Sequence, residues 1–147
     1  MALDELQGTD LGTQTVVVER APVPVFATAV GDDASAYRGE DAPVPPTYPF
    51  VWSYWGTQEG EVRGLPIAEL RKRGMILHGE QAFEYHRWPR VGDVLEGHRT
   101  IAEVYERDTS SARMEFYVMA TEWRDKATGE PVVTDRFTLI VRAKKES

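Results

Sequence analysis

The residues of this chain that could take part in proton transfer fall into two short segments. One segment holds Asp32 and its neighbour Asp33, directly after an apolar stretch that ends at Gly31. The other holds His78 and Glu80, within a run of alternating polar and apolar residues. Carboxylates and imidazoles are common general acids and bases in enzymes, so Asp32, His78 and Glu80 are the catalytic candidates. The competing interpretation makes Asp32 and Asp33 turn and cap residues.

The alternation over residues 75 to 86 limits what the second segment can do. It predicts a strand with His78, Glu80, Glu84 and His86 on one face and with Leu77, Gln81, Phe83 and Tyr85 on the other. The two histidines would then lie about 26 Å apart along the strand, too far to share a metal ion. We therefore predict no metal site and no resident cofactor. His78 and Glu80 could form an acid/base pair or serve as structural or substrate-side hydrogen-bonding groups, and Gly79 between them indicates a bulge or a close backbone approach.

The overall composition excludes several classes of protein. The net charge of −7 and the scattered Lys and Arg residues argue against a nucleic-acid surface. The chain has no cysteine, so disulfides, thiolate nucleophiles and sulfur-ligated metals are excluded. Its first residues are acidic where a signal peptide would be basic and then apolar. We expect a cytoplasmic protein with no membrane segment, organised as a single domain over residues 1–147 with loose ends at 1–10 and 144–147.

The most apolar stretch of the chain lies at residues 45–56, Pro-Pro-Thr-Tyr-Pro-Phe-Val-Trp-Ser-Tyr-Trp-Gly. If Thr47 caps a helix there, aromatic and apolar side chains point in every direction around its axis. A helix that is apolar all round has to be buried, and this one is too short to cross a bilayer. The rest of the chain must therefore enclose it.

The remaining elements can supply that enclosure. A strand is predicted near residues 13–19, a short helix ending at Gly31, a loop over 32–44, a second loop over 57–61 and a small helix over 65–74. Four long strands follow, at about 75–86, 93–106, 110–123 and 132–142, and the last has an apolar face formed by Val133, Phe137, Leu139 and Val141. This order predicts an α+β hot-dog fold, a curved antiparallel sheet wrapped around a central aromatic helix.

Three segments resemble a known family in the expected order. They are Val16 to Asp33 with its Ala-Val-Gly-Asp-Asp ending, Ile76 to Arg87, and Arg90-Val91-Gly92-Asp93-Val94-Leu95. Together they are similar to the N-terminal-type domain of MaoC-like dehydratases, in the branch described as FAS1-like dehydratase or non-catalytic hydroxyacyl dehydratase subunit. The resemblance covers roughly residues 11 to 143.

This resemblance implies a protein that handles acyl groups as thioesters of coenzyme A or acyl carrier protein. The family's catalytic motif is an Asp followed five positions later by a His; here Asp32 is followed by Tyr37, which is not an ordinary general base near neutral pH. The chain therefore looks like the acyl-binding half of an (R)-specific enoyl-CoA hydratase or 3-hydroxyacyl-thioester dehydratase. The resemblance further implies a heterodimer with a catalytic MaoC-like chain, or a homodimer. The expected lining of its acyl pocket is Pro45, Tyr48, Phe50, Trp52 and Trp55.

Two other functions fit the same pattern. The chain could be a non-enzymatic acyl-thioester binding module that self-associates through the edge of its sheet. It could also be an acyl-CoA thioesterase, with Glu59 or Glu61 as the catalytic carboxylate. Fold alone does not choose between these functions.

Overall fold

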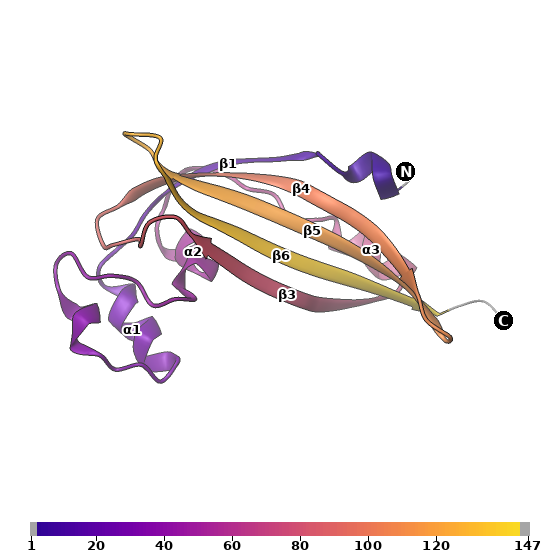
Figure 1. Ribbon diagram of the computed structural model, residues 1–147, viewed down its shortest axis with the longest axis horizontal. Helices are drawn as coiled ribbons and strands as arrows, with labels where there is room; N and C mark the ends of the chain where they lie inside the picture. The colour runs from indigo at the N-terminus through magenta and orange to yellow at the C-terminus, as the bar shows by residue number, and fades with distance from the viewer. Residues whose placement is uncertain (1–2, 145–147) are drawn as a thin grey trace.

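The computed structural model describes residues 3–144 (Figure 1), and one antiparallel sheet dominates that part of the chain. The sheet has six strands in the order β2-β1-β4-β5-β6-β3, and its long strands bow along their length (Figure 1). The strands are β1 (Asp10–Val17), β2 (Thr57–Gly60), β3 (Met75–Tyr85), β4 (Val94–Asp108), β5 (Ala112–Asp125) and β6 (Pro131–Lys144). The predicted α+β class with a curved antiparallel sheet is confirmed, as are the four long strands at residues 75–142.

The helical segments are short. They are η1 (Leu3–Leu6), α1 (Pro22–Ala29), η2 (Ser35–Arg38), η3 (Tyr48–Phe50), α2 (Trp52–Trp55) and α3 (Ile67–Arg73). Helix α1 begins at a proline, which needs no N–H partner there, and Gly31 follows it with a φ of 79°. Helix α3 ends in three cations. Both helices were predicted.

The expected continuous aromatic helix is wrong in length and in burial. Residues 48–55 form a 3₁₀ turn and then a single α-helical turn. Pro49 cannot donate a backbone hydrogen bond, and the N–H groups of Phe50 and Val51 each reach back three residues rather than four. Thr47 makes no side-chain cap.

Only one side of this segment is enclosed. Tyr48 and Trp52 are buried, whereas Phe50, Tyr54 and Trp55 expose 50%, 78% and 48% of their surfaces. The aromatic segment therefore covers the sheet at one end only and does not run along its whole length.

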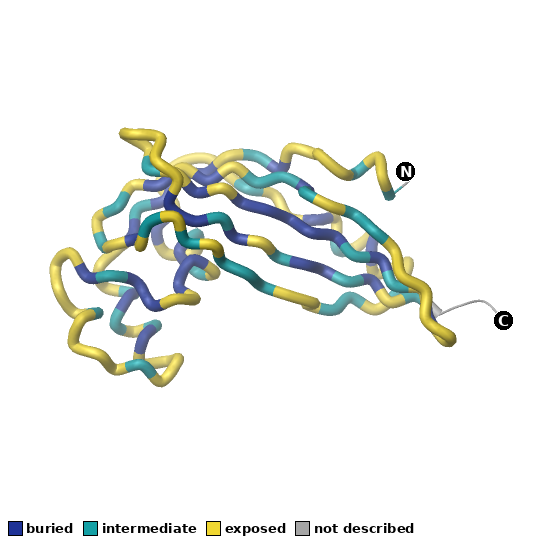
Figure 2. The backbone as a smooth tube through the Cα atoms, viewed as in Figure 1, coloured by how far each residue is buried: buried dark blue, intermediate teal, exposed yellow. Residues whose placement is uncertain are grey.

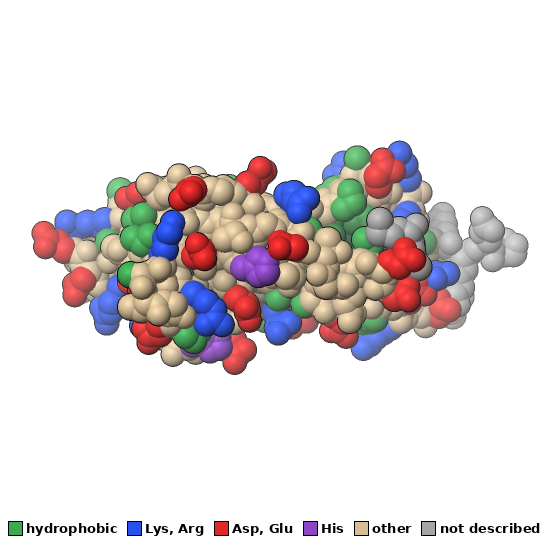
Figure 3. Space-filling view, turned by 90° about the horizontal axis from the view of Figure 1, so that it is seen from above, with side chains coloured by type: hydrophobic (Ala, Val, Ile, Leu, Met, Phe, Trp, Pro, Cys, Tyr) green, Lys and Arg blue, Asp and Glu red, His purple; other side chains and the backbone are tan. Residues whose placement is uncertain are grey.

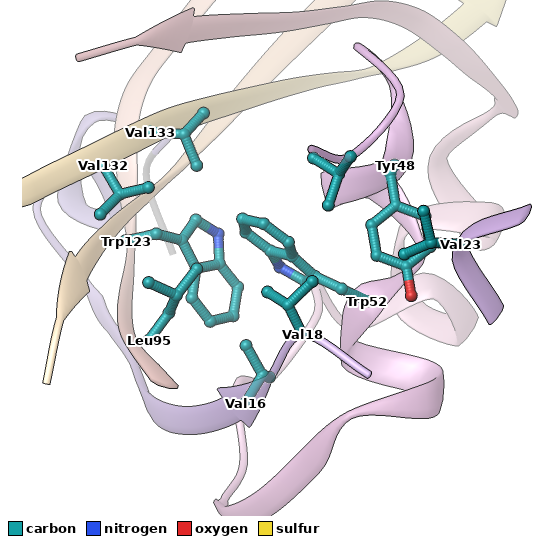
Figure 4. Close-up of a cluster of buried hydrophobic side chains, with 10 residues drawn as sticks. Val16, Val18, Val23, Tyr48, Trp52, Leu95, Trp123, Val132 and Val133 are labelled. Atoms are coloured by element: carbon teal, nitrogen blue, oxygen red, sulfur yellow. The ribbon is translucent and has the colours of Figure 1, made fainter. Parts of the chain in front are cut away.

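Two hydrophobic clusters lie on the face of the sheet that α2 and α3 cover, which we call the inner face. Figure 2 shows buried residues along the strands of the sheet. The tryptophan cluster consists of Val16, Val18, Val23, Val44, Tyr48, Trp52, Leu95, Trp123, Val132 and Val133. The leucine cluster consists of Leu11, Leu65, Leu70, Ile101, Tyr117, Met119, Leu139 and Val141. In Figure 4 the indole rings of Trp52 and Trp123 lie together at the centre of the first cluster; their centroids are 5.1 Å apart in an edge-to-face arrangement.

Two further expectations about the chain need correction. Residues 57–60 were expected to be a loop, but they form the edge strand β2 against β1. Residues 1–10 were expected to form a loose arm or one helical turn; within the described residues η1 is one 3₁₀ turn, and its Leu3 and Leu6 pack against the leucine cluster and are not loose. The expected looseness of residues 1–2 and 145–147 lies outside the described residues. On the face shown in Figure 3, acidic and basic side chains are interspersed.

Candidate functional site

A cavity of about 490 Å³ lies on the inner face between α2 and α3. The sheet supplies its floor with Met119, Phe137 and Leu139. Leu65 and Ile67, at the start of α3, form part of the opposite wall. A cavity of this size and apolar character suits a small-molecule ligand, so we take it as the candidate site.

Polar side chains cross the floor of this cavity in a row. Arg99 on β4 pairs with Thr121 on β5, which in turn pairs with Asp135 on β6. Residues that pair directly in an antiparallel sheet point to the same face, so these three side chains lie side by side. Gln14 on β1 and Gln81 on β3 lie diagonally beyond the two ends, since their direct partners are Gly97 and Phe137. We call these five residues the polar belt; it separates the tryptophan cluster from the leucine cluster.

Burial controls the charge of the belt. Asp135 is 8% exposed, and this burial raises the pKa of its carboxyl group. Hydrogen bonds from Trp123 Nε1, at 3.4 Å, and from Gln81 act in the opposite direction, as does the nearby Arg99 charge. Burial likewise lowers the pKa of Arg99, although a guanidinium remains charged. The belt therefore places a cation beside a carboxyl group that resists ionisation.

The last turn of α3 is held to the sheet by an ion pair that is buried on the sheet side. Glu115 on β5 is 4% exposed and binds Arg73, the last residue of α3, at 2.5 Å. The hydroxyl of Tyr117 donates to the same carboxylate at 2.8 Å. These contacts fasten the end of α3 to the sheet, while Leu70 packs into the leucine cluster.

A β-bulge at Gly79 changes the predicted arrangement of β3. Pairing shifts between His78, opposite Leu139, and Glu80, opposite Thr138. The predicted placement of His78 and Glu80 on one face is therefore wrong: His78 faces the cavity together with Gln81, and Glu80 is exposed on the other face. This shift in pairing confirms the predicted bulge at Gly79.

His78 lies among aromatic rings at the cavity. Its ring meets Phe137 edge-on at 4.4 Å and lies 6.3 Å from Phe50. Since Glu80 points away, the two do not form an acid/base pair. His78 is placed to border a ligand.

Asp32 lies outside the residues that line the cavity. Its carboxylate accepts a hydrogen bond from Tyr37 Oη at 3.0 Å and one from the Ala34 N–H at 3.3 Å. Burial and this hydrogen bond both raise the pKa of Tyr37, so its hydroxyl stays protonated at neutral pH. Asp33 pairs with Arg38 in the same five-residue spacing. The Asp32–Tyr37 contact is thus a hydrogen bond within a turn, which is the geometry that the turn interpretation predicts.

The predicted pocket-wall residues divide between the cavity and the core. Phe50 lines the cavity. Tyr48 and Trp52 point into the tryptophan cluster, Pro45 is buried away from the lining, and Trp55 stacks on Tyr48 with centroids 6.2 Å apart. Neighbouring residues line the cavity in their place, namely Pro49, Ser53 and Tyr54.

Sequence reasoning missed the polar belt. Asp135 stands between Val133 and Phe137 on the face predicted to be apolar, and Arg99 stands between Gly97 and Ile101. A charged residue that interrupts an apolar face is the signal that could have revealed them, because burying a charge is costly without a role or a partner.

The two thioesterase candidates lie in different places: Glu61 lines the cavity, whereas Glu59 pairs with Lys126 at 3.4 Å.

Two further features are missing from the residues that the structure describes. No helix there is long and apolar enough to cross a membrane. Within residues 3–144, His, Asp and Glu side chains form no group of three or more that could hold a metal ion.

Comparison with known proteins gives consistent matches. A family model described as the FAS1-like dehydratase domain region matches residues 5–135. A UPF0336 protein of Streptomyces griseus is 34% identical over 158 aligned positions that cover 100% of both chains.

Solved structures support the same fold. A MaoC-like dehydratase superimposes with a TM-score of 0.73 at 20% identity, covering 95% of this chain and 43% of that one. The C-terminally truncated HadBC complex of Mycobacterium tuberculosis, a 3R-hydroxyacyl-ACP dehydratase, gives 0.67 at 20% identity, covering 92% and 96%. At these identities the matches establish the fold alone, and the predicted hot-dog fold is confirmed.

Proposed function

This chain belongs to the FAS1-like dehydratase family, and from that premise we propose that it is the acyl-binding half of an enoyl-thioester hydratase or 3-hydroxyacyl-thioester dehydratase. The hydration reaction requires a group that deprotonates water and a group that protonates the carbon next to the thioester carbonyl. In this proposal a second, MaoC-like chain supplies those groups. The present chain holds the acyl tail in its inner-face cavity.

One observation carries the proposal: the chain has a cavity with a largely apolar lining, and the pair with the spacing of the family's catalytic motif does not lie at it. The Asp32–Tyr37 pair has the spacing of the family's catalytic motif, yet Tyr37 keeps its proton and the pair lies outside the cavity lining. His78 is the imidazole at the cavity, and its neighbour Glu80 faces away. A binding wall requires only shape and apolar surface, and this cavity provides both.

The exposed edge of the sheet is a suitable place for the second chain. Strand β3 is eleven residues long and pairs with β6 alone among the described strands. An unpaired strand edge of this length favours association with another strand. The matched HadBC structure is itself a complex, which supports a partnered assembly for this chain.

The test is an assay of crotonyl-CoA hydration by the purified chain alone and then together with the protein encoded beside it. We expect activity only in the mixture. Asp32→Ala and His78→Ala variants should retain the mixture's turnover number within about threefold, because neither residue transfers a proton in this proposal. Strong activity of the chain alone, abolished by either substitution, would overturn it.

The same edge also supports a second candidate, a self-associating module without catalytic activity. Pairing of two β3 edges would generate a symmetric homodimer. Measurement of molecular mass in solution separates the candidates. A stable homodimer that ignores the neighbouring protein and leaves crotonyl-CoA unchanged would favour the module.

A further inference from the structure

The polar belt contains a buried hydrogen-bond acceptor without a partner. Gln14 is 6% exposed, and within the described residues its Oε1 atom has no hydrogen bond. Its Nε2 atom donates to Thr57 Oγ1 at 2.7 Å. Leaving a buried polar group unpaired costs about 1–3 kcal/mol of free energy. A ligand that donates a hydrogen bond to this oxygen would remove that cost.

The orientation of the Gln14 amide follows from its neighbour. The hydroxyl of Thr57 donates its single proton to the Ser53 carbonyl. Thr57 Oγ1 must therefore accept from Gln14, which only the amide nitrogen can satisfy. This fixes the oxygen as the free end of a side chain that lines the cavity.

Arg99 offers the complementary group. Its Nε atom donates to Thr121 Oγ1 at 3.0 Å. In the part of the chain that the structure describes, its two terminal nitrogens make no hydrogen bond or ion pair, although Arg99 lines the same cavity. The cavity floor therefore has donors that lack an acceptor at Arg99, and an acceptor that lacks a donor at Gln14. The two residues are diagonal neighbours across β1 and β4. Their backbones are then about 7–8 Å apart, so the two long side chains can both reach one ligand group between them.

A hydroxyl group satisfies both demands at once. It donates one hydrogen bond and accepts others. A ketone or a carboxylate could accept from Arg99 but could not donate to Gln14, and a carboxylate would also meet the Asp135 carboxyl group. An unsubstituted methylene group would leave both buried polar groups without a hydrogen-bond partner, which costs free energy.

We propose that the inner-face cavity selects acyl chains that carry a hydroxyl group on the tail, beyond the carbon that is hydrated or dehydrated, at the depth of the polar belt, where Gln14 accepts from that hydroxyl and Arg99 donates to it. This inference rests on the proposed acyl-binding function and adds a substrate class to it. Gln14 and Arg99 are then specificity-determining residues and take no part in proton transfer.

The test is calorimetric titration of the purified chain with a matched ligand series. The series contains dodecanoyl-CoA, its monohydroxy derivatives with the hydroxyl moved along the chain, and the matching keto compounds. We expect one hydroxyl position to bind about tenfold tighter than the unsubstituted chain, as two added hydrogen bonds would give. The corresponding ketone should lose most of that gain.

The variants Gln14→Met and Arg99→Met should each remove the hydroxyl preference while retaining the binding of dodecanoyl-CoA. The matched controls Gln58→Met and Arg136→Met change exposed residues of the neighbouring strand β2 and of the outer face of β6, and should keep the preference. Thermal unfolding of every variant verifies that it is folded. If one belt variant does not fold, the other variant and the wild-type series still decide the matter.

The outcomes are distinguishable. Equal binding of hydroxylated and unsubstituted chains overturns the inference but leaves the acyl-binding function standing. A ketone that binds as tightly as the hydroxyl compound overturns the role of Gln14. Failure of every acyl thioester to bind overturns both the inference and the proposed function.

Discussion

The tryptophan cluster and the leucine cluster share one sheet face but differ in what covers them. In the first, the rings of Tyr48 and Trp52 fill the space above the strands, and Trp52 is fully buried (Figure 4). In the second, Leu65 and Leu70 reach the sheet, while Met119 and Leu139 border an open cavity. The first region is filled by side chains, whereas the second leaves a cavity.

At Gly56 the aromatic segment ends in close contact with strand β1. Its carbonyl accepts from the Val17 N–H at 2.7 Å, and a Cβ at this position would lie 2.0 Å from the Val17 oxygen. The chain must therefore leave α2 beside β1 and continue as the edge strand β2. The cavity lies between α2 and α3.

The largest expected effect comes from removing the ring that closes the tryptophan cluster. Trp52→Ala should lower the free energy of unfolding by about 3–5 kcal/mol, as truncation of a buried large side chain does. Trp55→Ala should cost about 1 kcal/mol or less, because Trp55 is 48% exposed. Denaturant titration measures both. Equal losses would show that the two aromatic residues share one environment, contrary to the structure.

A tightly packed cluster should also resist added volume. A Cβ at Gly97 would lie 2.5 Å from the ring of Trp123, so Gly97→Ala should cost about 1–3 kcal/mol of unfolding free energy. Gly39→Ala, where a Cβ meets nothing within 4 Å and φ is −75°, is the control and should be nearly neutral. The comparison fails if both substitutions are equally tolerated.

The leucine cluster should tolerate the volume that the tryptophan cluster rejects. Ile67→Trp points a larger side chain into the cavity, so the free energy of unfolding should change by less than about 1 kcal/mol, against about 1–3 kcal/mol for Val133→Leu in the packed cluster. Binding of dodecanoyl-CoA should fall at least tenfold with Ile67→Trp, about 1.4 kcal/mol or more. Undiminished binding would place the acyl chain elsewhere.

The smallest effect concerns the pH dependence of the belt. Burial raises the pKa of Asp135, so the folded protein holds this proton more tightly than the unfolded chain does. The free energy of unfolding therefore falls as pH rises from 3.8 through the raised pKa. Asp135→Asn removes this titration, so the stability of the variant relative to the wild type should increase with pH. Denaturant titrations across this range check it, and a pH-independent difference would contradict it.

Local patterns in the sequence were sufficient for most elements of the fold. The long strands and α3 were predicted because alternation, turn residues and terminal charges agree there. Strand β2 was missed because Thr57–Gly60 is polar, exposed and ends in glycine, so only its pairing with β1 makes it a strand. The aromatic helix was predicted too long because its first half, around Pro49, forms a 3₁₀ turn.

The candidate site was less predictable than the fold. Of the candidate site residues, Phe50 and His78 line the cavity, whereas Trp52 is a core residue and Glu80 faces away. The polar belt depends on the register of four neighbouring strands, which brings Gln14, Arg99 and Asp135 together from distant parts of the chain. No local pattern contains that information.

The bulge at Gly79 bears on how relatives of this chain should be aligned. Residues 75–78 and 80–85 are out of phase by one position, so even and odd positions exchange faces between the two halves of the same strand. A relative that lacked one residue here would present the opposite set of side chains to the cavity from one half of β3. Substitution patterns in this strand are therefore meaningful only when each half is counted separately from the glycine.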